Sequence, residues 1–174
     1  MAGAALALAT VPGVSLAQEG ARRDCVVSTA TPAFKAQVGA AMTGDGDEAA
    51  RDALFAQLGT IVDGCVEKHK IADTDKGTYF DYSLARISRE WLVGDIAKAN
   101  LKAAIVDKAL DFGPGGANPD LSGEMTEEQI NKIVQAYIAD GVDIGKVDQS
   151  VWERVGAYAA ATSIYWNKRN ALPF

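Results

Sequence analysis

The sequence predicts an all-α fold, a bundle of five to six helices with a buried helix over about 78–93 at its centre. Apolar residues recur every three to four positions along most of the chain, and no stretch alternates as a half-buried strand does. The segment 78–110 contains no proline, and its apolar residues fall on two separate stripes of a helix. A surface helix has one apolar stripe, so a helix with two is expected to lie between neighbours on both sides.

Length and charge limit the possible functions. A chain of 174 residues suits one domain, which we expect to cover 18–174. A net charge of −6 and a pI near 4.8 argue against a nucleic-acid partner, because phosphate binding requires clustered lysine and arginine. No window approaches the roughly 18 apolar residues that a membrane-spanning helix needs, so no membrane span is predicted.

The first 17 residues have the pattern of a secretory signal peptide. A short apolar run ends at Pro12, and small residues stand at Ser15 and Ala17, which predicts cleavage after Ala17. No lysine or arginine precedes the run, so a start further upstream, with a basic region of its own, stays open. We expect the chain to be periplasmic or secreted.

The expected export predicts the redox state of the two cysteines. An oxidising compartment favours a disulfide between Cys25 and Cys65, the only cysteines in the chain. Two buried free thiols are the alternative. We expect 18–31 to be an extended arm that the bridge pins against the bundle.

The N-terminal half of the bundle is expected to contain two helices before the central one. Thr31 and Pro32 are typical of a helix start, with threonine as the N-cap and proline at the first helical position. The next helix is predicted over about 47–70, because its apolar residues keep helical spacing and include Cys65.

The central helix is expected to start at Thr78, which would cap it together with Asp81. Gly94 interrupts the pattern and the apolar face rotates after it, which predicts a kink near Gly94 and a continuation to about residue 110. The segment 111–125 contains four glycines and two prolines, so we expect an irregular surface connection. A functional loop is the alternative, since long irregular loops often bind ligands.

Two capping boxes are predicted in the C-terminal part. Thr126 and Gln129 form one, at the start of a helix that ends near Gly141. Ser150 and Glu153 form the other, at the start of a mostly apolar helix over about 150–170. Small residues on that last helix would permit close packing against the central helix.

A polar seam on the central helix is the first candidate site. Arg86 and Glu90 are four residues apart and can form an ion pair, with Ser83 and Tyr79 on the same face. A plain surface salt bridge is the alternative interpretation. If the seam lies in a cleft, Glu90 could serve as the carboxylate of a hydrolase.

Aromatic residues are the second candidate. The aromatics that could enclose an apolar ligand beneath the 111–125 loop are Trp91, Tyr158, Tyr165 and Trp166. At helical spacing the same residues could equally form the core.

The sequence predicts no catalytic residues, metal site or cofactor, because His69 is the single histidine and no paired-cysteine motif is present. The function we expect is therefore a small exported, non-enzymatic binding or interaction protein of the cell envelope, with an envelope protein as its partner. A helical carrier of an apolar small molecule is the alternative, and a carboxylate hydrolase using Glu90 is a second one. The sequence predicts no oligomeric state.

Overall fold

The computed structural model describes residues 16–44 and 47–174, and this part of the chain contains seven α-helices, two short 3-10 helices and no strand. The all-α prediction is confirmed. The expected signal peptide lies almost wholly outside the described residues. The elements are α1 (Leu16–Thr29), α2 (Pro32–Ala41), α3 (Glu48–His69), η1 (Asp73–Asp75), α4 (Lys76–Ala97), α5 (Ala103–Ala109), α6 (Glu127–Ala139), η2 (Ile144–Lys146) and α7 (Gln149–Ala171).

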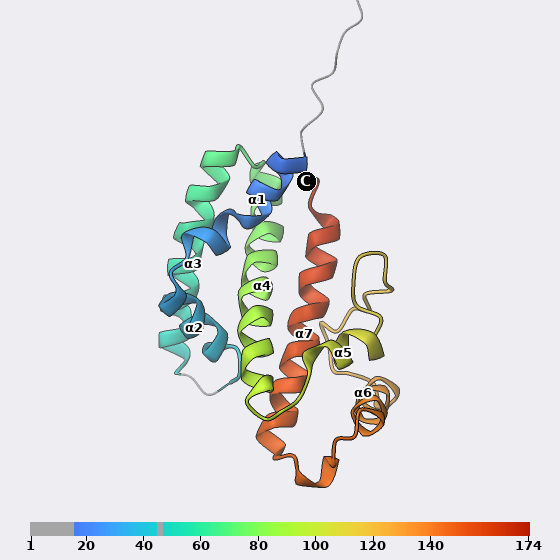
Figure 1. Cartoon of the computed structure of the whole chain (residues 1–174). Helices are drawn as coiled ribbons and strands as arrows, with labels where there is room; N and C mark the ends of the chain where they lie inside the picture. Colours follow the sequence, from blue (N-terminus) through green and yellow to red (C-terminus); the bar gives the residue numbers. More distant parts are fainter. Residues whose placement is uncertain (1–15, 45–46) are drawn as a thin grey trace, which may run out of the picture.

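Helices α4 and α7 form the centre of the molecule. They run antiparallel side by side, with α2 and α3 on one side of the pair and α5 and α6 on the other (Figure 1). Helix α4 contacts α1, α2, α3, α5 and α7, and its most extensive packing is against α7. The predicted central helix and its close C-terminal partner are therefore both present.

The buried side chains form two clusters that share α4. One joins its C-terminal half, through Leu92 and Ile96, to α5, α6 and the N-terminal half of α7. The other joins its N-terminal half, through Tyr79 and Tyr82, to α1, α2 and α3. The two halves of α4 thus belong to different clusters of the core.

The expected extended arm is wrong, because α1 is helical from Leu16 to Thr29. Cys25 and Val26 are its only buried residues, which gives the sequence too sparse an apolar pattern to indicate a helix. Contacts with α3 and α4 hold the segment, and most helices in proteins owe their stability to such packing. The helix predicted to start at Thr31 is confirmed, and Thr31 Oγ1 accepts from the Phe34 amide at 3.2 Å.

The predicted start of the central helix is also wrong, and the helix is unbroken at Gly94. Helix α4 starts at Lys76, directly after η1, so Thr78 lies within its first turn. It continues through Gly94 to Ala97, and the chain reverses at Asn100, which has a φ of 59°. Leu92 and Ile96 are fully buried on either side of Gly94, and their burial outweighs the roughly 1 kcal/mol that a helical glycine costs.

The two predicted capping boxes have different outcomes. The box of Thr126 and Gln129 at the start of α6 is confirmed in both directions. The second is wrong, because α7 starts at Gln149 with Asp148 as its N-cap, and Ser150 is already helical. None of the described helices is both long and apolar enough to cross a membrane.

Candidate functional site

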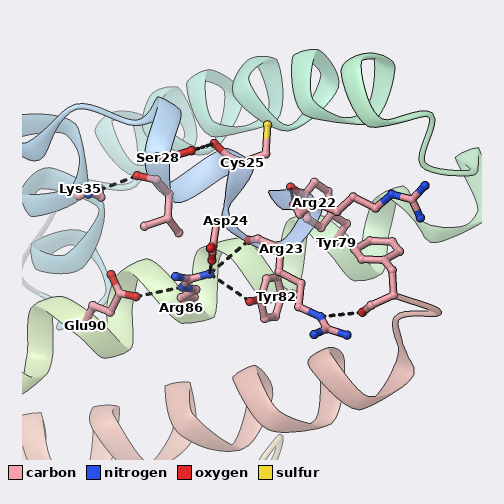
Figure 2. A network of polar contacts seen from close by, with 12 residues as sticks. Arg22, Arg23, Asp24, Cys25, Ser28, Lys35, Tyr79, Tyr82, Arg86 and Glu90 are labelled. Atoms are coloured by element: carbon pink, nitrogen blue, oxygen red, sulfur yellow. Dashed lines mark hydrogen bonds and ion pairs between the residues drawn. The ribbon is translucent and has the colours of Figure 1, made fainter. Parts of the chain in front are cut away.

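The polar seam of α4 faces helix α1, not open solvent (Figure 2). Arg86 is its centre: Nε lies 3.0 Å from Glu90 Oε1, and Nη1 lies 2.6 Å from Asp24 Oδ1. Nη1 also donates to the main-chain oxygen of Arg23 at 3.2 Å. Burial lowers the pKa of the Arg86 guanidinium, but the bonds to Asp24 and Glu90 outweigh it, so the pKa stands above its ordinary value. Arg86 is a permanent cation that links α4 to α1.

The other two seam residues lie deeper. Tyr79 and Ser83 are fully buried; the Tyr79 hydroxyl donates to the main-chain oxygen of Arg22 at 2.6 Å, and Ser83 Oγ donates to that of Tyr79 at 2.8 Å. Burial raises the pKa of Tyr79 to about 12. The ring of Phe174 packs edge-on against Tyr79 at 5.9 Å between centroids. These contacts fasten α1 and residue 174 to the same end of α4.

This geometry gives little support to carboxylate chemistry. Glu90 is half-exposed and bonded to Arg86, and Asp24, the nearest acidic neighbour in the network, shares the same guanidinium. An acid and base pair for hydrolysis needs two carboxyl groups across a substrate-sized gap. Here a cation fills the gap. We therefore interpret the seam as the anchor of α1.

The predicted disulfide joins α1 to α3. Cys25 and Cys65 are both buried, with their Cα atoms 5.9 Å apart, and the described residues contain no free cysteine. The bridge lies beside the seam (Figure 2), so α1 is held by one covalent link and one ionic link. A disulfide is consistent with an oxidising compartment.

The four candidate aromatics do not surround one hollow. Tyr158 is fully buried and donates to Asp107 Oδ1 at 2.8 Å. The guanidinium carbon of Arg89 lies 5.4 Å from the ring centre of Tyr158 and 5.6 Å from that of Tyr165. Burial raises the pKa of the Tyr158 phenol. Tyr158 and Tyr165 therefore enclose an arginine of the protein itself.

Trp166 and Trp91 lie in different surroundings. Trp166 meets Tyr165 edge-on at 5.0 Å, and the guanidinium of Arg169 lies 5.0 Å from its ring centre. Trp91 packs against α2 at Gly39, so closely that a β-carbon on this glycine would overlap it. Of the four candidate aromatics, Trp91 borders a hollow of about 650 Å³ between α2 and α3.

The 111–125 loop is fastened to α7. Asn118 is buried and donates to two glycine main-chain oxygens within the loop. Ser163 accepts from the Leu121 amide at 2.9 Å and donates to the Pro119 main-chain oxygen at 2.8 Å. The loop packs on α7 through these bonds, and the expected ligand site beneath it stays a prediction.

The surface best suited to binding was missed by the sequence reasoning. It is a groove of about 410 Å³ between α6, η2 and α7, which we call the α6–α7 groove, lined by Met125, Ile130, Val134, Ile144 and Trp152 among others. Ile130 is 44% exposed and Ile144 is 37% exposed. Ile138, one turn beyond Val134 and outside the lining of the groove, is 43% exposed. Exposed apolar side chains in and beside one groove mark an interaction surface.

The signal for this groove was present in the sequence as the width of an apolar stripe. At about 100° per residue, the apolar residues of α6 cover roughly 140° of the circumference of the helix, with Ile133 at one edge of the stripe and Ile138 at the other. The core takes only Ile133 and Tyr137, and the other side of the stripe stays exposed.

One acidic residue, Glu153, lines the groove, and no basic residue does. Glu124 and Asp148 neighbour lining residues in the sequence, and Glu127 precedes Ile130 by one helical turn. Other carboxylates of this region pair with lysines, as Asp140 does with Lys102, but these four have no basic partner within 4.0 Å among the described residues. The groove is thus mostly apolar, with acidic residues on or near its lining.

The described residues contain no group of three or more histidine, cysteine or acidic side chains that could hold a metal ion. No protein family model, curated protein or solved structure matches the chain.

Proposed function

We propose that this chain is an exported, non-enzymatic binding protein that holds an amphipathic, basic helical segment of a partner protein in the α6–α7 groove. The observation that carries the proposal is the exposed apolar lining of that groove, Ile130 and Ile144 above all, beside carboxylates that have no basic partner within 4.0 Å among the described residues. The polar seam and three of the four candidate aromatics are occupied by contacts of the protein with itself.

The dimensions favour a helix as the occupant. On α7 the lining of the groove runs from Gln149 to Gly156, which corresponds to about 10 Å of helix. Two turns of a partner helix cover that length, with apolar anchors at helical spacing. Laying an apolar helix face into a groove between two helices is a recurrent mode of peptide recognition.

The charge on and near the lining of the groove favours a basic partner. Glu124, Glu127, Asp148 and Glu153 would face lysine or arginine side chains at the edges of the bound segment. A second copy of this chain is a poorer occupant, because a symmetric contact would bring the same carboxylates of both copies together.

Export supports an envelope setting for this binding. The disulfide of Cys25 and Cys65 suits an oxidising compartment, and the signal-peptide pattern of residues 1–17 suits secretion.

A pair of designed peptides tests the proposal. Each has about 18 residues and leucines at helical spacing, one with lysines on its remaining faces and the other with glutamates at the same positions. The Trp91→Phe/Trp166→Phe variant leaves Trp152 in the groove as the only tryptophan. We expect the lysine peptide to shift the Trp152 emission to the blue with a Kd on the order of 10 µM, and the glutamate peptide to bind at least about tenfold more weakly.

Two matched substitutions locate the binding. Ile130→Ser should weaken the lysine peptide about tenfold, since the apolar anchor is lost. Val93→Ser is the control, because Val93 is 41% exposed on α4 and outside the groove, and it should leave the affinity unchanged. Equal binding of both peptides, no binding of either at about 1 mM, or equal effects of the two substitutions would overturn the proposal.

A further inference from the structure

A second hollow lies on the opposite side of the α4–α7 pair, between α2 and α3. It has a volume of about 650 Å³ and is lined by residues of α2, α3, α4 and α7. Apolar surface comes from Trp91, Leu54 and four alanines, and polar groups come from Arg51 and Arg154 among others. A hollow of this size, mostly apolar with a few polar groups, is typical of small-molecule sites.

Trp91 forms a fixed wall of this hollow. Its side chain lies against the backbone of α2 at Gly39, where no larger residue fits. The ammonium of Lys98 lies 6.0 Å from the ring centre. Since α2 and Lys98 hold the indole in place, it offers a bound ring a rigid aromatic surface.

The charges of the hollow differ from those of the rest of the molecule. Asp95, which is only 8% exposed, pairs with Lys98 Nζ at 2.8 Å and with Arg154 Nε at 3.2 Å. Arg51 is half-buried and has no ion pair or hydrogen bond from its side chain to another described residue. Two arginines and two aspartates are the charged residues that line the hollow, so their charges balance in a chain of net charge −6.

We propose that this hollow binds a small organic anion with a planar, apolar body. The guanidinium of Arg51 receives the anionic group, and the ring packs on Trp91, Leu54 and the alanines of α2 and α3. Arginine suits this role because its planar fork matches a carboxylate or sulfonate with two parallel hydrogen bonds. Asp95 keeps Arg154 in place, so that Arg51 is the cation left to bind the ligand.

A charged ligand and its neutral analogue test the proposal directly. The probes are 4-phenylbutyrate and 4-phenylbutanamide, which differ only in the anionic group. The Trp152→Phe/Trp166→Phe variant leaves Trp91 as the only tryptophan and reports on this hollow alone. We expect phenylbutyrate to change the Trp91 emission with a Kd below about 1 mM, and the amide to bind at least about tenfold more weakly.

Substitutions then assign the charge. Arg51→Gln should remove the preference for phenylbutyrate, whereas Lys108→Gln, which neutralises an exposed cation on α5, should preserve it. Equal affinity for the two probes, no binding at about 10 mM, or an unchanged preference in Arg51→Gln would overturn the proposal. Ile130→Ser, which disables the α6–α7 groove, should leave phenylbutyrate binding intact, so the two sites can fail separately.

Discussion

Gly39→Ala should destabilise the protein although it replaces a helical glycine with the best helix former. An ideal β-carbon at this position lies 2.5 Å from Trp91 Cβ and 2.6 Å from Trp91 Cδ2. Carbon atoms in contact prefer about 3.5–4.0 Å, so the overlap is roughly 1 Å. The Cβ atom of Trp91 is fixed by the backbone of α4, and therefore α2 as a whole must move away.

The expected magnitude follows from two opposing effects. Alanine in place of glycine gains about 1 kcal/mol of helix propensity. Overpacking of a tight contact costs about 1–3 kcal/mol, and more when the clash involves atoms close to a backbone. We expect a net loss of up to about 2 kcal/mol in the free energy of unfolding for Gly39→Ala.

Gly94→Ala is the matched control. Gly94 is exposed in the interior of α4, and a β-carbon there meets nothing within 4 Å. This substitution should gain about 0.5–1 kcal/mol. Urea unfolding of both variants measures the difference. A Gly39→Ala variant as stable as Gly94→Ala would refute the packing of α2 on Trp91, and with it the rigid wall of the α2–α3 hollow.

Three further predictions concern the N-terminal half of the molecule. Cys25→Ser/Cys65→Ser should lower the free energy of unfolding by about 4 kcal/mol, from the loop of sequence separation 40 that the bridge closes; an unchanged urea midpoint would argue that the bond contributes nothing. Arg86→Met should lower the free energy of unfolding by about 1–2 kcal/mol, a figure kept small because the two carboxylates that Arg86 binds are partly exposed to solvent. Amide hydrogen exchange should become faster in α1 than in the other helices. An equal increase in all helices would contradict the anchoring role of Arg86. Burial raises the pKa of Tyr79 and Tyr137 to about 12, so these phenols keep their protons in the folded state at a pH where unfolded phenols lose them. The free energy of unfolding should therefore fall between about pH 10 and 12. Phenolate absorbance of both tyrosines that rises near pH 10 while the circular dichroism stays native would contradict this.

The sequence was sufficient for the fold class and for the elements with regular patterns. The apolar spacing of 47–70 predicted α3, and the two stripes after residue 78 predicted that α4 lies between two neighbours. The pairing of Cys25 with Cys65 followed from their being the only cysteines. These features depend on local spacing or on counting, which a single sequence contains.

The errors arose where tertiary contacts decide the local structure. Helix α1 has few buried residues and is held by Cys65 and Arg86, which lie 40 and more residues away in the chain. Helix α4 passes through Gly94 because Leu92 and Ile96 are buried against distant elements. No local pattern reports on those partners.

The polar seam was predicted in part from the sequence, whereas the α6–α7 groove was not. The ion pair of Arg86 with Glu90 was predicted correctly from their spacing. The second ion pair of Arg86, with Asp24, depends on where α1 packs. The α6–α7 groove depends on η2 and Trp152 meeting α6. Its one local sign is an apolar stripe on α6 that is wider than the core requires.

The most direct test of the central claim is the amide NMR spectrum of the isotopically labelled protein, recorded with and without the lysine peptide. The account predicts that the largest chemical-shift changes fall on Ile130, Val134, Ile144 and the Trp152 indole, with α1 unaffected. Changes centred on α1 or on the α2–α3 hollow, or no changes at saturating peptide, would contradict the assignment of the groove as the binding surface.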